Sequence, residues 1–114
     1  MKGNQKIIKV LNDLLTGELT AMDIYFLHSR IYHDQGLGKL FTRIDHEMQD
    51  ETNHASQLIE RILFLEGQPI LGQRRPFKAS TDVKVMLQDE LDYELENATE
   101  LKAAIKLCRS EERR

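Results

Sequence analysis

The sequence has no tryptophan, one cysteine and two prolines among its 114 residues. The single cysteine, Cys108, excludes a disulfide within the chain, and we interpret it as a small core residue. No apolar run approaches the about 18–20 residues of a membrane-spanning helix, so we expect no membrane partner. The N-terminus also lacks the apolar stretch of a signal peptide. We therefore expect a cytoplasmic location.

The chain has little excess charge of either sign. Its formal net charge is −3 and its pI is near 5.8, so nothing in the charge balance favours nucleic-acid binding. Hydrophobic residues make up 40% of the chain and charged residues 31%, a balance that suits a soluble helical protein and is too apolar for a disordered one. The length allows one domain at most, and we assign residues 1–114 to a single domain.

Three segments carry helical signals, at about residues 4–34, 38–66 and 81–110. Asn4 is a suitable N-cap for the first segment. Gly36 lies in the short turn between the first two, where glycine readily adopts a positive φ. Two long helices joined by a short turn lie antiparallel. The sequence therefore predicts an all-α fold.

Residues 67–80 contain both prolines and show no helical periodicity. Gly67 and Pro69 end the second helix, and Thr81 with Asp82 supplies a cap and a negative charge for the third. Loops of this length are uncommon in compact domains, and a crossover between two parallel helices explains this one. Three helices are three-quarters of a four-helix bundle. Either another chain supplies the fourth helix or this chain is truncated.

Three glutamates, Glu18, Glu51 and Glu94, interrupt apolar stripes at positions where leucine would be expected. Residues three and four apart share one face of a helix, and this alternation is the seam of a helical bundle. Burying a lone carboxylate costs roughly several kcal/mol unless it is neutralised, paired or bound to a cation. The stripes are Leu11, Leu15, Glu18, Met22 and Tyr25; Ile44, Met48, Glu51, Ala55, Leu58, Ile62 and Leu65; and Leu87, Leu91, Glu94, Ala98, Leu101, Ile105 and Cys108.

Glu51 and His54 stand at positions i and i+3, so both side chains can reach one ion. A carboxylate with an imidazole suits iron, manganese or zinc. The alternative is that the three glutamates are core carboxylates paired with arginine or lysine. We disfavour it because none of the three stripes carries a basic residue. The stripes therefore predict a metal site facing the bundle interior.

Other residues near the stripes receive simpler interpretations. Tyr25 shares a stripe with Glu18, and we favour core packing over a redox role for it. Met22 and Met48 are expected to fill space in the core before they act as ligands. His28 and His33 are expected on the surface, on or near the polar side of the first helix.

The residues around these positions resemble the bacterioferritins. The segments that carry the resemblance are Glu18-Leu19, Tyr25 to Arg30, His46 to Ala55, Ile59 to Gly67 and Asp89 to Glu94, and it extends from Met1 to about Cys108. It implies a ferritin-like four-helix bundle, of which this chain holds three long helices. It also implies a hollow shell of 24 subunits that oxidises Fe(II) and stores Fe(III) mineral.

The resemblance implies a role for each of the candidate ligands. Glu18, Glu51 and His54 would bind the first iron. Glu51 would also bridge to a second iron, which Glu94 would help to hold. The family's second Glu-x-x-His pair is absent, because all four histidines precede the crossover. We therefore expect this form to oxidise iron slowly or not at all.

Two further features concern iron and haem. His46 and Asp50, one turn apart, match an inner-surface iron site seen in some members, although a solvated polar edge explains the pair equally well. Haem-binding members carry a methionine directly after the bridging glutamate, where this chain has Thr52. Met48, one turn earlier, is misplaced for a shared two-fold haem. This subunit alone is therefore not expected to bind haem b, and a mixed shell with a haem-binding subunit is consistent with the sequence.

The function implied is iron storage and detoxification with ferroxidase activity, Fe(II) and Fe(III) being the ligands and the subunit forming a homo- or hetero-oligomer. The alternative is a truncated, catalytically impaired helical subunit that serves interaction or assembly, because uncovered apolar stripes favour association.

Overall fold

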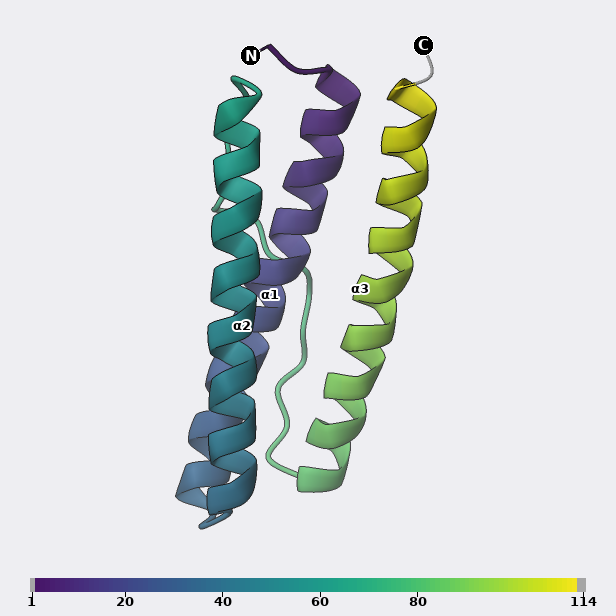
Figure 1. Cartoon of the computed structure of the whole chain (residues 1–114). Coiled ribbons are helices and arrows are strands. Elements are labelled where there is room, and N and C mark those ends of the chain that lie inside the picture. Colours follow the sequence, from purple (N-terminus) through teal and green to yellow (C-terminus); the bar gives the residue numbers. More distant parts are fainter. Residues whose placement is uncertain (1, 113–114) are drawn as a thin grey trace.

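The computed structural model describes residues 2–112, which form three helices and no strand. They are α1 (Gln5–Asp34), α2 (Gly38–Phe64) and α3 (Val83–Glu112). Helices α1 and α2 are antiparallel, and α3 runs parallel to α2, so the end of α3 returns to the end of the molecule where α1 begins (Figure 1). None of the described helices is both long and apolar enough to cross a membrane. The predicted all-α fold is confirmed.

The caps expected from the sequence form at two helix starts. The Asn4 side chain accepts a hydrogen bond of 2.7 Å from the Lys6 amide. At the start of α3, the Asp82 carboxylate accepts one of 3.1 Å from the Val85 amide. Each satisfies an amide that has no partner inside its helix. The predicted helix boundaries lie within two residues of those observed, the usual uncertainty at frayed ends.

The end of α2 differs from the prediction in its detail. The α-helix ends at Phe64 rather than Glu66, and Glu66 itself takes the left-handed conformation, with φ of 60°. The amide of Gly67 then bonds the Ile62 carbonyl at 2.9 Å. Gly67 is needed for a different reason, because a Cβ there would lie 2.8 Å from a methyl carbon of Ile8. Gly36, by contrast, has the predicted positive φ, of 75°.

The core consists of two apolar clusters on either side of the candidate glutamates. One cluster lies toward the α1–α2 turn and includes Tyr25, Ile44 and Met86, with Met48 packed against it. The other lies toward the opposite end and includes Leu15, Ala55 and Ile62, with Met22 packed against it. The two methionines thus fill space as predicted. Glu18 and Glu51 lie where the two clusters meet.

Helix α3 packs on α1 with a different face from the predicted apolar stripe. Its buried positions are Met86, Glu90, Tyr93 and Ala104. The apolar residues of the predicted stripe remain between two-fifths and three-fifths exposed, so the described residues cover them only in part. A helix that is apolar on two faces buries one here and leaves the other open. The open residues are Leu87, Leu91, Leu101 and Ile105.

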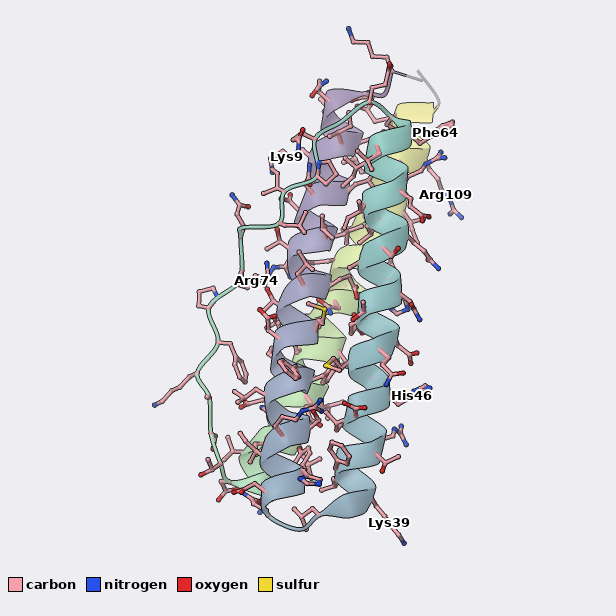
Figure 2. The ribbon with its side chains drawn as sticks, turned by 90° about the vertical axis from the view of Figure 1, so that its left-hand side faces the viewer. Lys9, Lys39, His46, Phe64, Arg74 and Arg109 are labelled. Carbon is pink, nitrogen blue, oxygen red and sulfur yellow. The ribbon has the colours of Figure 1, made fainter. Side chains whose placement is uncertain are left out.

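The predicted crossover runs along α1 to the start of α3 (Figures 1 and 2). Asn12, a buried side chain on α1, holds its first part: the amide nitrogen donates to the Gln68 carbonyl at 3.1 Å, and the oxygen accepts from the Ile70 amide at 2.9 Å. Further along, Arg74 pairs with Asp23 of α1 at 2.7 Å. The crossover is therefore attached to α1 by directional bonds.

Replacing Asn12 with alanine should destabilise the chain by about 1–3 kcal/mol, because two hydrogen bonds, to the Gln68 carbonyl and from the Ile70 amide, are lost. Urea unfolding measures this loss. Gln73→Ala, a change on the exposed part of the crossover, is the control and should have little effect. Equal stability of the Asn12→Ala variant and the original chain would contradict the anchoring role.

Candidate metal centre

Glu18, Glu51 and His54 meet between α1 and α2. The His54 Nδ1 atom lies 3.3 Å from a Glu18 oxygen and 3.6 Å from a Glu51 oxygen. One ligand atom from each of the three residues lies within 4.8 Å of the others. Antiparallel packing brings the middle of α1 beside the middle of α2, and the i, i+3 spacing places Glu51 and His54 on the same side. This is the grouping that the sequence predicted.

Glu51 has the most buried side chain of the three residues in this group. Its side chain is only 6% exposed, whereas that of His54 is 54% exposed. The buried Oε2 atom of Glu51 accepts no hydrogen bond from the described residues. A buried carboxylate oxygen without a partner carries a large desolvation penalty. Two carboxylates and an imidazole that converge on one point suit a divalent cation such as Fe(II), so the residues present fit a metal.

Burial raises the pKa of the Glu18 carboxyl above its ordinary value. The neighbouring His54 opposes this change, whereas the negative charge of Glu94 adds to it. A carboxyl group that is poorly solvated and close to other carboxylates is stabilised in its charged form by a bound cation. The electrostatics of the site therefore favour a positive ion beside Glu18.

Glu94 lies beside this group without joining it. Its carboxylate is exposed and accepts a short hydrogen bond from the Tyr25 hydroxyl. Tyr25 is itself 2% exposed, as expected of a core residue. Glu94 and the three converging residues line one cavity of about 480 Å³, which is bordered by all three helices. The structure thus brings Glu94 to the edge of the site and holds it there by Tyr25.

His46 and Asp50 lie one turn apart on α2, with 3.5 Å between Nδ1 and Oδ2. Glu47, which the sequence argument overlooked, completes a second group whose ligand atoms lie within 4.8 Å of one another. Figure 2 shows His46 on the side of α2 that faces away from α1. Its side chain is 70% exposed. This geometry is compatible both with the inner-surface iron site and with the solvated polar edge considered above.

The prediction that His28 is a surface residue is wrong. Its ring is fully buried, 2.6 Å from the Glu90 carboxylate of α3, which also accepts a 2.7 Å hydrogen bond from Tyr32. Phe77 of the crossover covers the ring, with centroids 5.7 Å apart. Tyr25, His28 and Tyr32 share one face of α1 by their spacing. This aromatic face is the sequence signal that could have predicted a second contact surface on α1, and with it the burial of His28. His33 is exposed, as predicted.

The raised pKa of Glu18 predicts a pH-dependent effect of Glu18→Gln in the metal-free chain. The carboxyl contributes most to stability in its protonated form, below its ordinary pKa of 4.5, and this contribution is lost as the pH rises through the raised pKa. Glutamine resembles the protonated form. Urea unfolding in the presence of a chelator should therefore show the variant more stable at pH 7 and unchanged at about pH 4.

Glu60→Gln, on the exposed face of α2, controls for the lost charge. A Glu18→Gln variant that is no more stable than this control at pH 7 would contradict the argument from burial.

Comparison with known proteins places this geometry in a family. The ferritin-like domain profile matches residues 8–114. A bacterial ferritin of Synechocystis sp. is 55% identical over 112 residues, which cover 98% of this chain and 72% of the relative. That of Paramagnetospirillum magnetotacticum is 51% identical, covering 99% and 69%. A bacterioferritin of Brucella melitensis is 37% identical, covering 95% and 67%. The chain therefore belongs to the ferritin family, among relatives named bacterial ferritin and bacterioferritin.

Proposed function

We propose that this chain is an iron-storage subunit that takes up Fe(II) at Glu18, Glu51 and His54. Membership of the ferritin family supports iron storage as its role, and favours this function over that of a purely structural assembly subunit. The observation that carries the site is the buried Glu51 oxygen without a hydrogen-bond partner, beside a second carboxylate and an imidazole. A bound cation would interact with that oxygen in place of the missing hydrogen-bond donor.

The proposed reaction is the oxidation of Fe(II), the substrate, to Fe(III) by oxygen or peroxide. Carboxylate ligands stabilise the higher charge of the product. Metal ligands must be deprotonated, so uptake should weaken at acid pH. Glu94 is the further ligand proposed for a second iron. The Tyr25 hydrogen bond uses only one oxygen of the Glu94 carboxylate.

We further propose that the working form is a cytoplasmic shell of 24 subunits, with copies of this chain alone or mixed with a haem-binding subunit. The exposed leucine stripe of α3 supports an additional helix packed against it, because an apolar face of this length favours association. In such a shell, the His46, Glu47 and Asp50 group would bind iron weakly on its way to the mineral.

His54→Ala should lower the affinity for the first metal ion by at least about tenfold, because even the loss of an outer-shell partner has an effect of this size. Co(II) absorption titration measures binding without the complication of oxidation, and stopped-flow measures Fe(II) oxidation. His33→Ala removes an exposed histidine outside both ligand groups and is the control. If Co(II) binds equally well to both variants and the original chain, the site lies elsewhere.

Thr52 is exposed, and its hydroxyl donates to the Met48 carbonyl at 3.0 Å. A hydroxyl is a poor haem-iron ligand, whereas a methionine sulfur binds it well. We propose that shells made of this subunit alone contain no haem. Thr52→Met should introduce a haem absorption band after reconstitution, with Thr42→Met, on an exposed part of α2, as the control. Stoichiometric haem in the unmodified protein would refute the ligand argument.

A further inference from the structure

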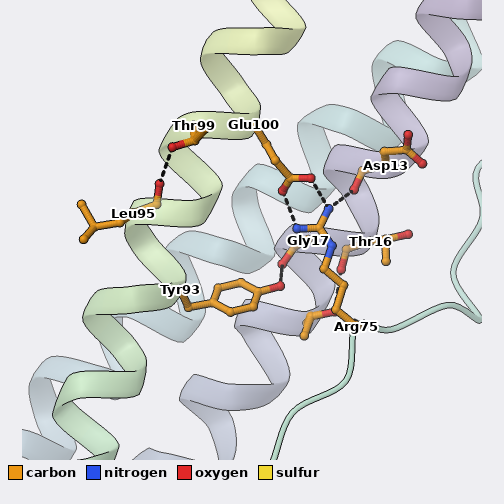
Figure 3. A network of polar contacts seen from close by, with 9 residues as sticks. Asp13, Thr16, Gly17, Arg75, Tyr93, Leu95, Thr99 and Glu100 are labelled. Carbon is orange, nitrogen blue, oxygen red and sulfur yellow. Dashed lines mark hydrogen bonds and ion pairs between the residues drawn. The ribbon is translucent and has the colours of Figure 1, made fainter.

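Arg75, in the crossover, joins three parts of the chain that are far apart in the sequence (Figure 3). Both ends of its guanidinium contact the Glu100 carboxylate of α3, one of them at 2.7 Å. The same guanidinium donates to the Asp13 carbonyl of α1 at 2.9 Å. A bidentate ion pair of this kind fixes the relative orientation of the two side chains as well as the distance between them. The crossover therefore holds α3 against α1 at this level.

Gly17, which has no side chain, leaves room on α1 for this arginine. A Cβ on Gly17 would lie 3.1 Å from the guanidinium, closer than a side chain normally approaches. The backbone amide of Arg75 also donates to the Thr20 hydroxyl at 3.0 Å, and Tyr93 of α3 donates to the Gly17 carbonyl at 3.1 Å. Gly17 immediately precedes the candidate ligand Glu18. The crossover and α3 therefore both contact the turn of α1 that carries this ligand.

The attachment matters because α3 packs on α1 and, among the described residues, makes no close backbone approach to α2. The three converging ligands belong to α1 and α2, whereas Glu94 belongs to α3. The distance of Glu94 from the three converging ligands therefore depends on how α3 is held against α1. Glu100 lies about two turns beyond Glu94 on the same rigid helix. Arg75 is therefore in a position to determine where Glu94 lies.

Arg74 provides a comparison within the same segment. It pairs with Asp23 of α1, whose side chain is half exposed, and among the described residues it forms no hydrogen bond or ion pair with α3. An exposed ion pair of this kind has little effect on stability. We propose that Arg75 is a positioning residue of the iron site, which by clamping α3 to α1 sets Glu94 beside Glu18, Glu51 and His54. This inference rests on the proposed function.

The first test measures the clamp without any metal. Amide hydrogen exchange in α3, between Glu94 and Glu100, should become faster by about tenfold or more in Arg75→Ala, because the segment opens more readily. Arg74→Ala should exchange at the original rate. If Arg75→Ala fails to fold, Glu100→Gln keeps the shape of its side chain and removes the charge pair, and should act in the same direction. Unchanged exchange in a folded variant would overturn the inference.

The second test separates positioning from general stability. Glu94→Gln should weaken binding of the second Co(II) ion by about tenfold, and Arg75→Ala should reproduce that loss although Glu94 is intact. The double variant should bind no more weakly than either single variant, because each removes the same interaction. Arg74→Ala should bind as the original chain does. Losses that add in the double variant would show that Arg75 acts independently of Glu94 and would overturn the inference.

The two proposals fail in different ways. If the original chain binds no Co(II) in a manner that depends on His54, the proposed function fails, and the role of Arg75 in the iron site fails with it, whatever the exchange data show. If Co(II) binds through His54 but Arg75→Ala binds as tightly as Arg74→Ala, the proposed function stands and only the role of Arg75 is overturned.

Discussion

Burial of the Glu51 carboxylate between α1 and α2 is the constraint around which the rest of this structure is arranged. A carboxylate in an apolar seam costs several kcal/mol, roughly, unless a partner offsets the penalty. One oxygen of Glu51 accepts no hydrogen bond from the described residues and lies 3.6 Å from the His54 Nδ1 atom. Apolar clusters on either side hold the two helices together in spite of this penalty. Their packing leaves Glu18 and His54 directed at the same point. An ion bound there would also stabilise the folded chain, since it binds the folded form only.

Helix α3 is attached by apolar packing, through Met86 and Tyr93, and in addition by polar contacts. Directional polar contacts hold it on α1: Glu90 with His28 and Tyr32, Tyr93 with a backbone carbonyl, and Glu100 with the arginine of the crossover. Such contacts depend on geometry more than apolar packing does. They fix the rotation of α3 and leave its leucine stripe uncovered. The α1–α2 pair and α3, whose rotation is fixed by polar contacts, therefore meet at the candidate metal centre.

Much of this was predictable because it depends on neighbours in the sequence. The caps at Asn4 and Asp82, the positive φ at Gly36 and the crossover between parallel helices all follow from local signals, and the structure contains each of them. The spacing of Glu51 and His54 places both on one side of α2 whatever surrounds them. Apolar periodicity likewise identified the stripes of α1 and α2, since each of these helices has a dominant apolar face.

Tertiary structure decided the remaining features, which join residues from separate helices. Helix α3 is apolar on two faces, so its periodicity alone did not show which face packs on α1. That choice places Glu90 against a buried His28, which the sequence argument assigned to the surface, and holds Glu94 by Tyr25 at the edge of the ligand group. Periodicity describes one helix at a time. Contacts between helices depend on their rotation and separation, which are set by the packing of the whole bundle.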